Sequence, residues 1–311
     1  MSVMKALITG VNGFVGPYLV KHLITNGFEV FGIDRSGKEV DDCAVEKCDV
    51  TDYNTVFAVI KRVAPDCIFH LAGQSSVAKS WKEPELTRKI NVGGAKNIFE
   101  AVAAAKINPK ILVVSSAEVY GVAKKFPTGE SEPLKPISPY GESRVEQEKL
   151  ALEYFRSTGM KIVISRSFNH TGAGQPSELV CSNFAKQLAD IEKGRQKPVV
   201  MVGDLSIARD FSDVRDVVRA YLLLVQKGSF GEVYNVCSGR TLTIGEILDK
   251  LVKISKLDVK VEHEKSKVTE TVVPVLHGDN SKIRAATGWK PTIDFDDTLS
   301  ALLDYWRKNI T

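Results

Sequence analysis

The stretch Thr9-Gly-Val-Asn-Gly-Phe-Val-Gly16 restricts the fold of this chain more than any other feature, because it places three glycines between a predicted strand and a predicted helix. Gly10 permits a tight turn, Gly13 lets the backbone approach a pyrophosphate, and Gly16 allows close packing of helix and sheet. The helix N-terminus then offers free N–H groups and a positive dipole to phosphates. The pattern predicts a dinucleotide-binding loop, with a purely structural turn as the alternative.

An acidic residue follows at the end of the second predicted strand. Asp34 closes the run Glu29–Asp34. A carboxylate there can accept both ribose hydroxyls of NAD and would repel the 2′-phosphate of NADP. Arg35 comes next, and its guanidinium could bind that phosphate instead. We therefore expect NAD(H) as the cofactor, with NADP(H) as the alternative.

Short apolar runs alternate with longer amphipathic segments over the first 170 residues. The predicted strands are residues 6–9, 29–34, 67–72, 111–115 and 161–165, and the predicted helices are residues 17–25, 53–63, 92–105 and 143–157. Strands that are apolar throughout and alternate with helices form parallel sheets covered on both faces. The predicted fold class is α/β, a Rossmann-type doubly wound parallel sheet.

The rhythm of the sequence changes after Phe168. Residues 169–182 are predicted to form a loop, residues 183–192, 213–226, 243–255 and 296–308 helices, and residues 198–202 and 233–237 strands. We predict a Rossmann domain of residues 1–169 plus 212–237. A smaller C-terminal lobe of residues 170–211 plus 238–311 would bind the substrate.

Composition excludes several classes of function. The net charge is +4, from 42 basic and 38 acidic residues, and no basic block suggests nucleic-acid binding. No apolar run approaches the roughly 20 residues of a membrane helix, and no signal-peptide pattern precedes the first strand. The five cysteines lack CxxC spacing, so neither a metal site nor a disulfide framework is expected. We expect a cytoplasmic protein with reduced thiols.

A second motif, Tyr140-Gly-Glu-Ser-Arg144, carries acid–base chemistry. A tyrosine and a cation four positions apart share one face of a helix, and Ser116 could join them from a strand end. To act as a base near neutral pH, a tyrosine must lower its pKa by about three units, worth roughly 4 kcal/mol. A cation at about 4 Å supplies about that much at an effective dielectric of 20. Arg144 can therefore favour the tyrosinate, although its pKa above about 12 prevents it from releasing a proton. Alternatively, Tyr140 simply opens a helix after Ser138-Pro139.

Together these motifs resemble the extended short-chain dehydrogenase/reductase family, which contains nucleotide-sugar epimerases, dehydratases and reductases. The matching segments are the GxxGxxG loop, Asp49-Val50, His70–Gly73, Asn91–Gly94, Ser115–Gly121 and Tyr140 with Arg144. The resemblance covers nearly the whole chain. It implies that the cofactor is bound by Gly10, Asn12, Gly13, Phe14, Val15, Gly16, Asp34, Arg35, Asp49, Val50, Leu71, Ala72, Gly73, Tyr140 and Arg144.

The resemblance also implies the catalytic residues. Ser116 would hydrogen-bond the sugar 4-oxygen, Tyr140 would exchange a proton with it, and Arg144 would position Tyr140 and the ribose. The family normally has lysine at the position of Arg144. Glu118 matches the glutamate that removes a C5 proton in 4,6-dehydratases, but Ala117 stands where some of them carry a further acid. Dehydration is therefore less favoured than reduction or epimerisation, and Glu118 could equally be structural.

The segment Ser165–Gln175 narrows the choice of substrate. Its Phe-Asn-His-Thr-Gly sequence most resembles that of reductases that act on GDP-4-keto-6-deoxy-mannose. The guanidinium of Arg209 suits a diphosphate. Relatives usually carry an Arg-Pro pair where this chain has Thr269 and Glu270, which removes one phosphate contact. His70 and His170 are expected to be hydrogen-bonding residues near the site. The residues implied to bind substrate are Ser116, Asn169, His170, Asn183, Lys186 and Arg209.

The resemblance thus implies an NAD(P)-dependent enzyme that acts on a nucleotide-diphosphate sugar, with a GDP-sugar favoured. The expected reaction is reduction of the 4-keto group of GDP-4-dehydro-6-deoxy-D-mannose to GDP-rhamnose. The alternatives are a 4-epimerase, a 4,6-dehydratase and, in a different class, a non-catalytic NAD(P) or redox sensor suggested by Arg144. We expect a homodimer formed through the helices at 92–105 and 143–157.

Overall fold

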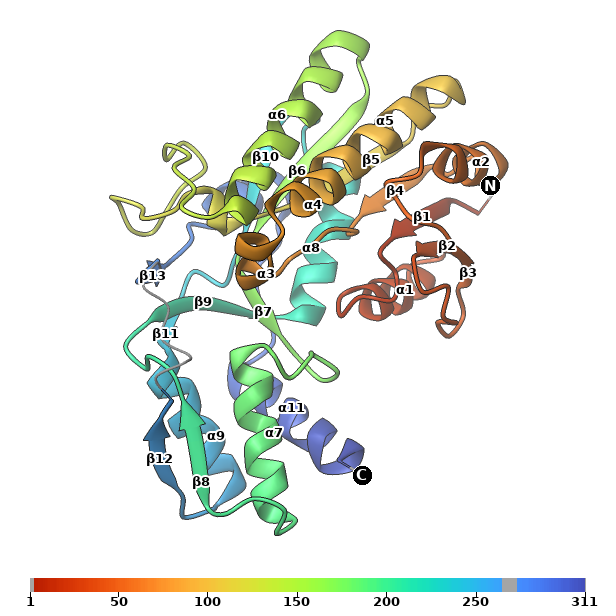
Figure 1. Ribbon diagram of the computed structural model, residues 1–311. Helices are drawn as coiled ribbons and strands as arrows, with labels where there is room; N and C mark the ends of the chain where they lie inside the picture. The colour runs from red at the N-terminus through yellow and green to blue at the C-terminus, as the bar shows by residue number, and fades with distance from the viewer. Residues whose placement is uncertain (1–2, 265–272, 311) are drawn as a thin grey trace.

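Seven parallel strands form the main sheet of the computed structural model, which describes residues 3–264 and 273–310 (Figure 1). The strand order is β10-β6-β5-β4-β1-β2-β3, and every pairing is parallel. The strands are β1 (Lys5–Thr9), β2 (Glu29–Asp34), β3 (Ala44–Lys47), β4 (Cys67–His70), β5 (Lys110–Ser116), β6 (Lys161–Ser167) and β10 (Val233–Val236). This arrangement confirms the predicted fold class. The order reverses between β1 and β4, where sheets of this kind bind ligands beyond the carboxyl ends of the strands.

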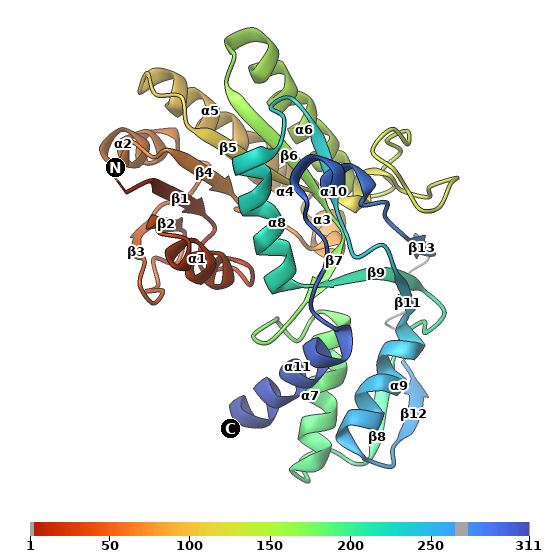
Figure 2. The same cartoon turned by 180° about the vertical axis from the view of Figure 1, so that it is seen from behind.

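Helices cover both faces of this sheet. One face carries α2 (Tyr53–Val63), α5 (Gly94–Ala104) and α6 (Pro139–Thr158) (Figure 1), and the other carries α1 (Gly16–Thr25), α8 (Val214–Lys227) and α10 (Ser281–Thr287) (Figure 2). Each helix buries an apolar stripe, such as Val56, Val59 and Ile60 of α2. Two apolar clusters result, one on each face, which explains why the central strands are apolar throughout.

The remaining segments build a smaller lobe around a third apolar cluster. Its helices are α7 (Val180–Glu192), α9 (Ile244–Ser255) and α11 (Phe295–Asn309), and β8 (Val199–Val202) pairs with β12 (Lys260–His263) beside them. A four-stranded sheet of β7 (Asn169–Thr171), β9 (Ala208–Asp213), β11 (Thr241–Thr243) and β13 (Val275–Leu276) lies between this lobe and the main sheet (Figure 1). Because β10 returns to the main sheet, we propose domain boundaries at residues 169/170, 211/212 and 237/238.

Several predicted elements need correction. The helix predicted to begin at Ser143 begins at Pro139, because the Ser138 hydroxyl caps it by accepting a hydrogen bond from the Gly141 N–H at 3.1 Å. The predicted loop at 169–182 contains β7, which pairs with β9. The helix predicted from Val92 is preceded by a π-helical turn at Lys89–Gly93, so α5 begins at Gly94.

Some short elements were not predicted. These are β3, β9, β11, β12, β13, α3 (Val77–Lys82), α4 (Pro84–Arg88) and α10. Most of them are two to seven residues long, and several carry charged side chains, so they have no clear apolar period. Thr269 and Glu270 lie outside the described residues. Within the described ranges, no helix combines the length and apolarity needed to cross a lipid bilayer.

Candidate active site

The glycine loop joins β1 to α1 at the point where the strand order reverses. Gly10 has a left-handed φ of +72°, and its N–H donates a hydrogen bond to the Ile33 carbonyl at 2.8 Å. A Cβ on Gly10 would lie 2.8 Å from the Cα of Ala72, and one on Gly16 would overlap the Val11 carbonyl. Gly13 is exposed at the turn. The geometry thus agrees with the predicted roles of these glycines, and the open backbone at Gly13 fits a dinucleotide.

Asp34 organises the loop that follows β2. The N–H and the hydroxyl of Ser36 both donate to its Oδ1 at 2.8 Å. The Ser36 hydroxyl also lies 2.8 Å from Asn12 Oδ1, while Asn12 Nδ2 donates to the Lys38 carbonyl at 2.9 Å. Ser36 thus joins the side chains of Asp34 and Asn12, two predicted cofactor residues, and Arg35 and Lys38 add two exposed cations.

The predicted cofactor groove would have its floor at the residues that follow β3 and β4. Leu71 N–H donates to the Thr9 carbonyl at 3.2 Å, and Ala72 N–H donates to the Thr9 hydroxyl at 3.1 Å. Gly73 is exposed, with the Arg144 guanidinium directly behind it. Asp49 and Val50 follow β3: Asp49 accepts a hydrogen bond from the Thr51 N–H at 2.8 Å, and Val50 is buried against Gly94.

Ser116 and Tyr140 come from neighbouring elements that pack against each other. Ser116 ends β5, and its hydroxyl caps a short 3₁₀ turn, η2 (Ala117–Val119), by accepting from the Glu118 N–H at 3.2 Å. Tyr140 lies in the first turn of α6 and is 7% exposed. The next residue, Gly141, packs so closely on this turn that a Cβ there would lie 2.8 Å from the Glu118 carbonyl oxygen. The structure therefore brings these elements together.

A buried ion pair fixes α6 against the sheet. Arg166 of β6 donates to both carboxylate oxygens of Glu148, with Nη2 to Oε2 at 2.8 Å. Ser115 donates to the same carboxylate at 2.6 Å, and Tyr120 lies 3.0 Å from Arg166 Nη1. These contacts tie the middle of α6, the helix of Tyr140 and Arg144, to β6 and to the end of β5, where Ser116 lies.

Arg144 is buried beneath Tyr140, with 4% of its surface exposed. Its guanidinium carbon lies 5.3 Å from the centre of the Tyr140 ring. Nη1 donates to the Val114 carbonyl at 3.1 Å and to Gln147 Oε1 at 2.8 Å. A cation therefore does lie beside the tyrosine, as the spacing predicts, and it is fixed by neutral partners.

Two predicted histidines play the hydrogen-bonding roles expected of them. His70 is 1% exposed, and its Nδ1 lies 2.8 Å from the Thr9 hydroxyl. Burial and the positive charge of Arg144 lower the pKa of His70 to about 3, so the ring is neutral. His170 Nδ1 donates to the Phe168 carbonyl at 3.0 Å, and its ring stacks on Phe14 at 6.2 Å. This stack joins the predicted substrate segment to the glycine loop.

The predicted substrate residues divide into two groups. Asn169 is exposed at the start of β7. Arg209 of β9 donates to the Ala208 carbonyl at 2.9 Å and faces Glu118: burial raises the pKa of Glu118, and the charge of Arg209 opposes that rise. Arg209 thus lies near the catalytic strand end, as a residue that binds a diphosphate there would have to.

The second group lies on α7. Asn183 borders a cleft of about 640 Å³ that is also lined by Gln187, Gln196, Lys197, Val199, Met201, Glu262 and Glu264. Lys186 instead pairs with Asp190 at 2.8 Å and lies over the Trp306 ring. Lys186 is therefore occupied by contacts within the lobe, which gives no support to its predicted substrate role.

Sequence reasoning missed several residues of the site. Gln147 and Ser36 contact predicted site residues. Asn91, which was already among the matching segments, is buried and joins the Gln74 backbone to Ser143, with Nδ2 donating to the serine hydroxyl at 2.9 Å. Asn91 lies inside the π-helical turn. The signal for Gln147 was its spacing, three residues after Arg144 on a helix.

Residues 7–302 match the model of a family described as GDP-mannose 4,6 dehydratase. The chain belongs to this family. A GDP-6-deoxy-D-mannose reductase of Pseudomonas aeruginosa is 34% identical over 310 residues, which cover 98% of each chain. The family membership confirms the predicted resemblance to the extended short-chain dehydrogenase/reductases.

Solved structures of related enzymes also resemble this chain over nearly its whole length. RMD from Pseudomonas aeruginosa, complexed with NADPH, has 30% sequence identity and a TM-score of 0.88, and the match covers 99% of this chain and 100% of the other. A UDP-glucose 4-epimerase of Thermotoga maritima, with UDP-glucose, has 30% identity and a TM-score of 0.90 over 98% and 99% of the two chains. The predicted enzyme class, an NAD(P)-dependent enzyme of the extended type, is confirmed. The predicted cofactor agrees, since solved relatives are complexes with NADPH or NAD.

Proposed function

We propose that this enzyme reduces the 4-keto group of GDP-4-dehydro-6-deoxy-D-mannose to GDP-rhamnose. The observation that carries the proposal is the buried Tyr140–Arg144 pair, whose helix packs on the Ser116–Glu118 turn at the carboxyl end of β5. That pair suits proton transfer to a carbonyl oxygen. The named activity of the Pseudomonas aeruginosa relative supports the choice of substrate.

The site residues divide the work of the reduction. The bound dihydronicotinamide would supply a hydride to the sugar C4. Ser116 would donate a hydrogen bond to the 4-oxygen, and Tyr140 would give its phenolic proton to the same oxygen. Arg144, 5.3 Å from the Tyr140 ring centre, would stabilise the tyrosinate that remains until solvent returns a proton. One hydride and one proton convert the ketone to the alcohol.

The substrate side supports a nucleotide-diphosphate sugar. Arg209 provides a guanidinium close to the catalytic strand end, where a diphosphate can accept its hydrogen bonds. The cleft beside Asn183 has the volume of a small-molecule pocket and is lined by amides and carboxylates that suit a base. We propose that the nucleotide lies there, with GDP favoured by the reductase relative.

A stoichiometric assay tests this proposal. Purified enzyme is mixed with NADPH and a limiting amount of GDP-4-dehydro-6-deoxy-D-mannose, and absorbance at the dihydronicotinamide band is followed. We expect one cofactor to be oxidised for each keto-sugar. A 4-epimerase, the alternative supported by the Thermotoga maritima likeness, inverts a 4-hydroxyl group and has no C4 alcohol to act on in this keto-sugar. Failure of the keto-sugar to oxidise NADPH would therefore reject the reductase assignment.

The loop after β2 supports NADPH alongside NADH. Asp34 Oδ1 is already engaged by two donors of Ser36, and Arg35 and Lys38 flank it with positive charge. We expect Arg35→Ala to raise KM for NADPH roughly fivefold to tenfold through loss of a charge-assisted hydrogen bond, and to leave KM for NADH within about twofold. An equal change for both cofactors would show that Arg35 does not bind the 2′-phosphate.

We also infer that the enzyme is a cytoplasmic homodimer. The α5 and α6 helices lie side by side on one face of the sheet, where a second copy could pair with both (Figure 1). Five thiols without disulfide partners suit a reducing compartment. Light scattering on the purified chain tests the dimer, and a monomeric mass across the micromolar range would exclude it.

A further inference from the structure

The guanidinium of Arg144 is held by a residue that the proposed reaction does not itself require. Nη1 donates to Gln147 Oε1 at 2.8 Å and to the Val114 carbonyl at 3.1 Å, so this one nitrogen makes both fixed bonds. Nη2 lies behind Gly73, where an added Cβ would approach it to 2.6 Å. The guanidinium is therefore held between α6, β5 and the floor of the cofactor groove.

Gln147 has no evident purpose apart from this bond. Its side chain is fully buried, and its Nε2 finds no acceptor among the described residues. A buried amide with unmet hydrogen bonds destabilises a fold relative to an apolar side chain of similar size. The gain that offsets this penalty must come from Oε1, whose partner is Arg144.

The partners of Arg144 are neutral, which preserves its charge. Gln147 and Val114 present uncharged oxygens. His70 is neutral because of its lowered pKa, and the hydroxyl of Tyr221, whose pKa is raised by burial, bonds to Ser167 at 2.8 Å. The positive charge therefore stays available to Tyr140. A carboxylate at position 147 would hold the guanidinium equally well but would cancel that charge.

We propose that Gln147 is a positioning residue that fixes the Arg144 guanidinium beside Tyr140, and that the two residues act as one unit. With this support, Arg144 can act at the position where the related family normally has lysine. The inference rests on the proposed function, because it assigns Arg144 to the support of Tyr140 during reduction of the keto-sugar.

A double-mutant cycle tests the coupling. Wild type, Gln147→Met, Arg144→Lys and the double variant are compared by kcat/KM and by the Kd for NADPH. Methionine matches the length of glutamine and cannot accept the bond. We expect Gln147→Met to lower kcat/KM about tenfold in the wild-type background and less than about twofold in the Arg144→Lys background, because an ammonium on the shorter lysine chain falls short of the Nη1 position. Equal losses in both backgrounds would overturn the proposal.

Two further measurements separate positioning from simple stability. Gln147→Met removes the unpaired Nε2 but also takes one acceptor from the buried Arg144 guanidinium. Because these two effects on stability oppose each other, we expect the unfolding temperature to stay within about 4 °C of wild type although the variant turns over more slowly. Gln147→Glu should keep the guanidinium in place but shift the pH profile of kcat upwards, because the new carboxylate opposes the tyrosinate. Gln226→Met, at an exposed position of α8, is the control and should change neither the unfolding temperature nor the pH profile of kcat.

Failure of the inference and failure of the proposed reaction give different results. If the wild type reduces no keto-sugar, the proposed reaction is wrong, while the Kd for NADPH still reports the coupling between positions 144 and 147. If the wild type is active and Gln147→Met matches it in kcat/KM, pH profile and Kd, Gln147 does not position Arg144 and the inference is rejected.

Discussion

At the scale of single residues, Tyr140 gains its chemistry from the first turn of α6. The Ser138 cap starts the helix early enough for Tyr140 and Arg144 to lie one turn apart on it. Arg144 then folds back beneath the ring instead of extending into solvent, and its guanidinium carbon lies 5.3 Å from the ring centre. The spacing of Tyr140 and Arg144 in the sequence therefore predicts the pair. The position of the guanidinium depends on Gln147 and the Val114 carbonyl, which the spacing does not reveal.

Removing the phenolic proton should stop the reaction and leave the fold intact. We expect Tyr140→Phe to lower kcat by roughly 10²–10⁴-fold, the range for loss of a general acid. The Kd for NADPH, measured by fluorescence, should change by less than about threefold, because the hydroxyl is not needed to build the groove. A variant that retains more than a tenth of wild-type kcat would remove Tyr140 from the proton-transfer step.

The buried His70 should make stability fall in mild acid. Its folded pKa is lowered to about 3, so the unfolded chain takes up a proton near pH 6.5 while the folded chain does not. Stability from this group is complete above about pH 6.5 and is lost as the pH falls from there towards 3, by about 1.4 kcal/mol between pH 7.5 and 5.5.

Denaturant titrations at pH 7.5 and 5.5 check this prediction, with His70→Asn as the comparison. Asparagine keeps a polar group near Thr9 but does not titrate. The loss of unfolding free energy between the two pH values should be smaller in the variant by about the same 1.4 kcal/mol. Identical pH dependence in both proteins would mean that His70 is not a buried neutral group.

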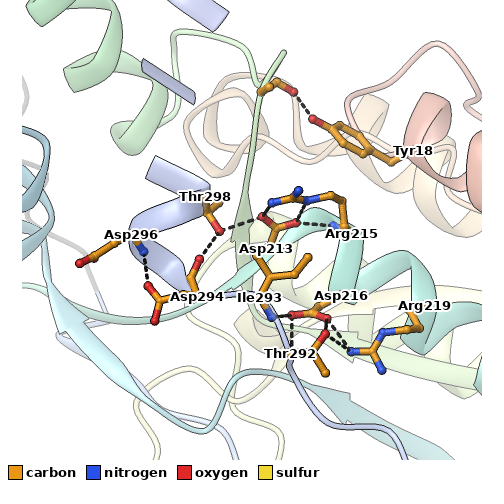
Figure 3. A network of polar contacts seen from close by, with 11 residues as sticks. Tyr18, Asp213, Arg215, Asp216, Arg219, Thr292, Ile293, Asp294, Asp296 and Thr298 are labelled. Atoms are coloured by element: carbon orange, nitrogen blue, oxygen red, sulfur yellow. Dashed lines mark hydrogen bonds and ion pairs between the residues drawn. The ribbon is translucent and has the colours of Figure 1, made fainter. Parts of the chain in front are cut away.

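At the scale of elements, two carboxylates at the start of α8 join the main sheet to the C-terminal segment (Figure 3). Asp213 caps α8 and accepts a hydrogen bond from the Thr298 hydroxyl of α11 at 2.7 Å. Asp216 accepts from the N–H groups of Thr292 and Ile293 at 2.9 and 3.0 Å. The same helix buries its apolar stripe on the main sheet, so α8 positions both parts of the molecule.

Loss of the Asp216 carboxylate should therefore destabilise the fold. We expect Asp216→Ala to lower the free energy of unfolding by roughly 2–4 kcal/mol, because it removes a buried carboxylate and leaves the partly buried N–H groups of Thr292 and Ile293 unpaired. Asp294→Ala removes only the exposed cap of α11 and should lower it by about 1 kcal/mol. Urea unfolding of the two variants makes the comparison, and equal losses would contradict a special role for Asp216.

The elements that sequence could predict are those with a strong apolar pattern. The strands β1, β2, β4, β5 and β6 and the helices α1, α2 and α8 follow the predictions to within a few residues. Elements set by contacts distant in sequence could not be found that way. The strand β7 lies in a segment rich in glycine and serine and exists because it pairs with β9, about 40 residues later.

At the scale of the whole molecule, the site also contains some residues that local sequence motifs predict and others that only tertiary packing brings together. The glycine loop, Asp34, Ser116, Tyr140 and Arg144 were predictable because local motifs carry them. The roles of Gln147, Ser36 and the Phe14–His170 stack depend on packing between elements, which no local pattern encodes. Lys186 is a predicted substrate residue that the structure does not support, since its ammonium pairs with Asp190.

The central claim, reduction at the sugar C4 supported by Tyr140, is tested most directly by following the hydride. NADPH carrying deuterium at both hydrogen positions of the nicotinamide C4 is incubated with GDP-4-dehydro-6-deoxy-D-mannose and the enzyme, with Tyr140→Phe in parallel, and the sugar product is examined by NMR. We predict deuterium at C4 of GDP-rhamnose in one equivalent with the wild type, and almost none with the variant over the same time. A product without deuterium at C4, or equal transfer by the variant, would contradict the account.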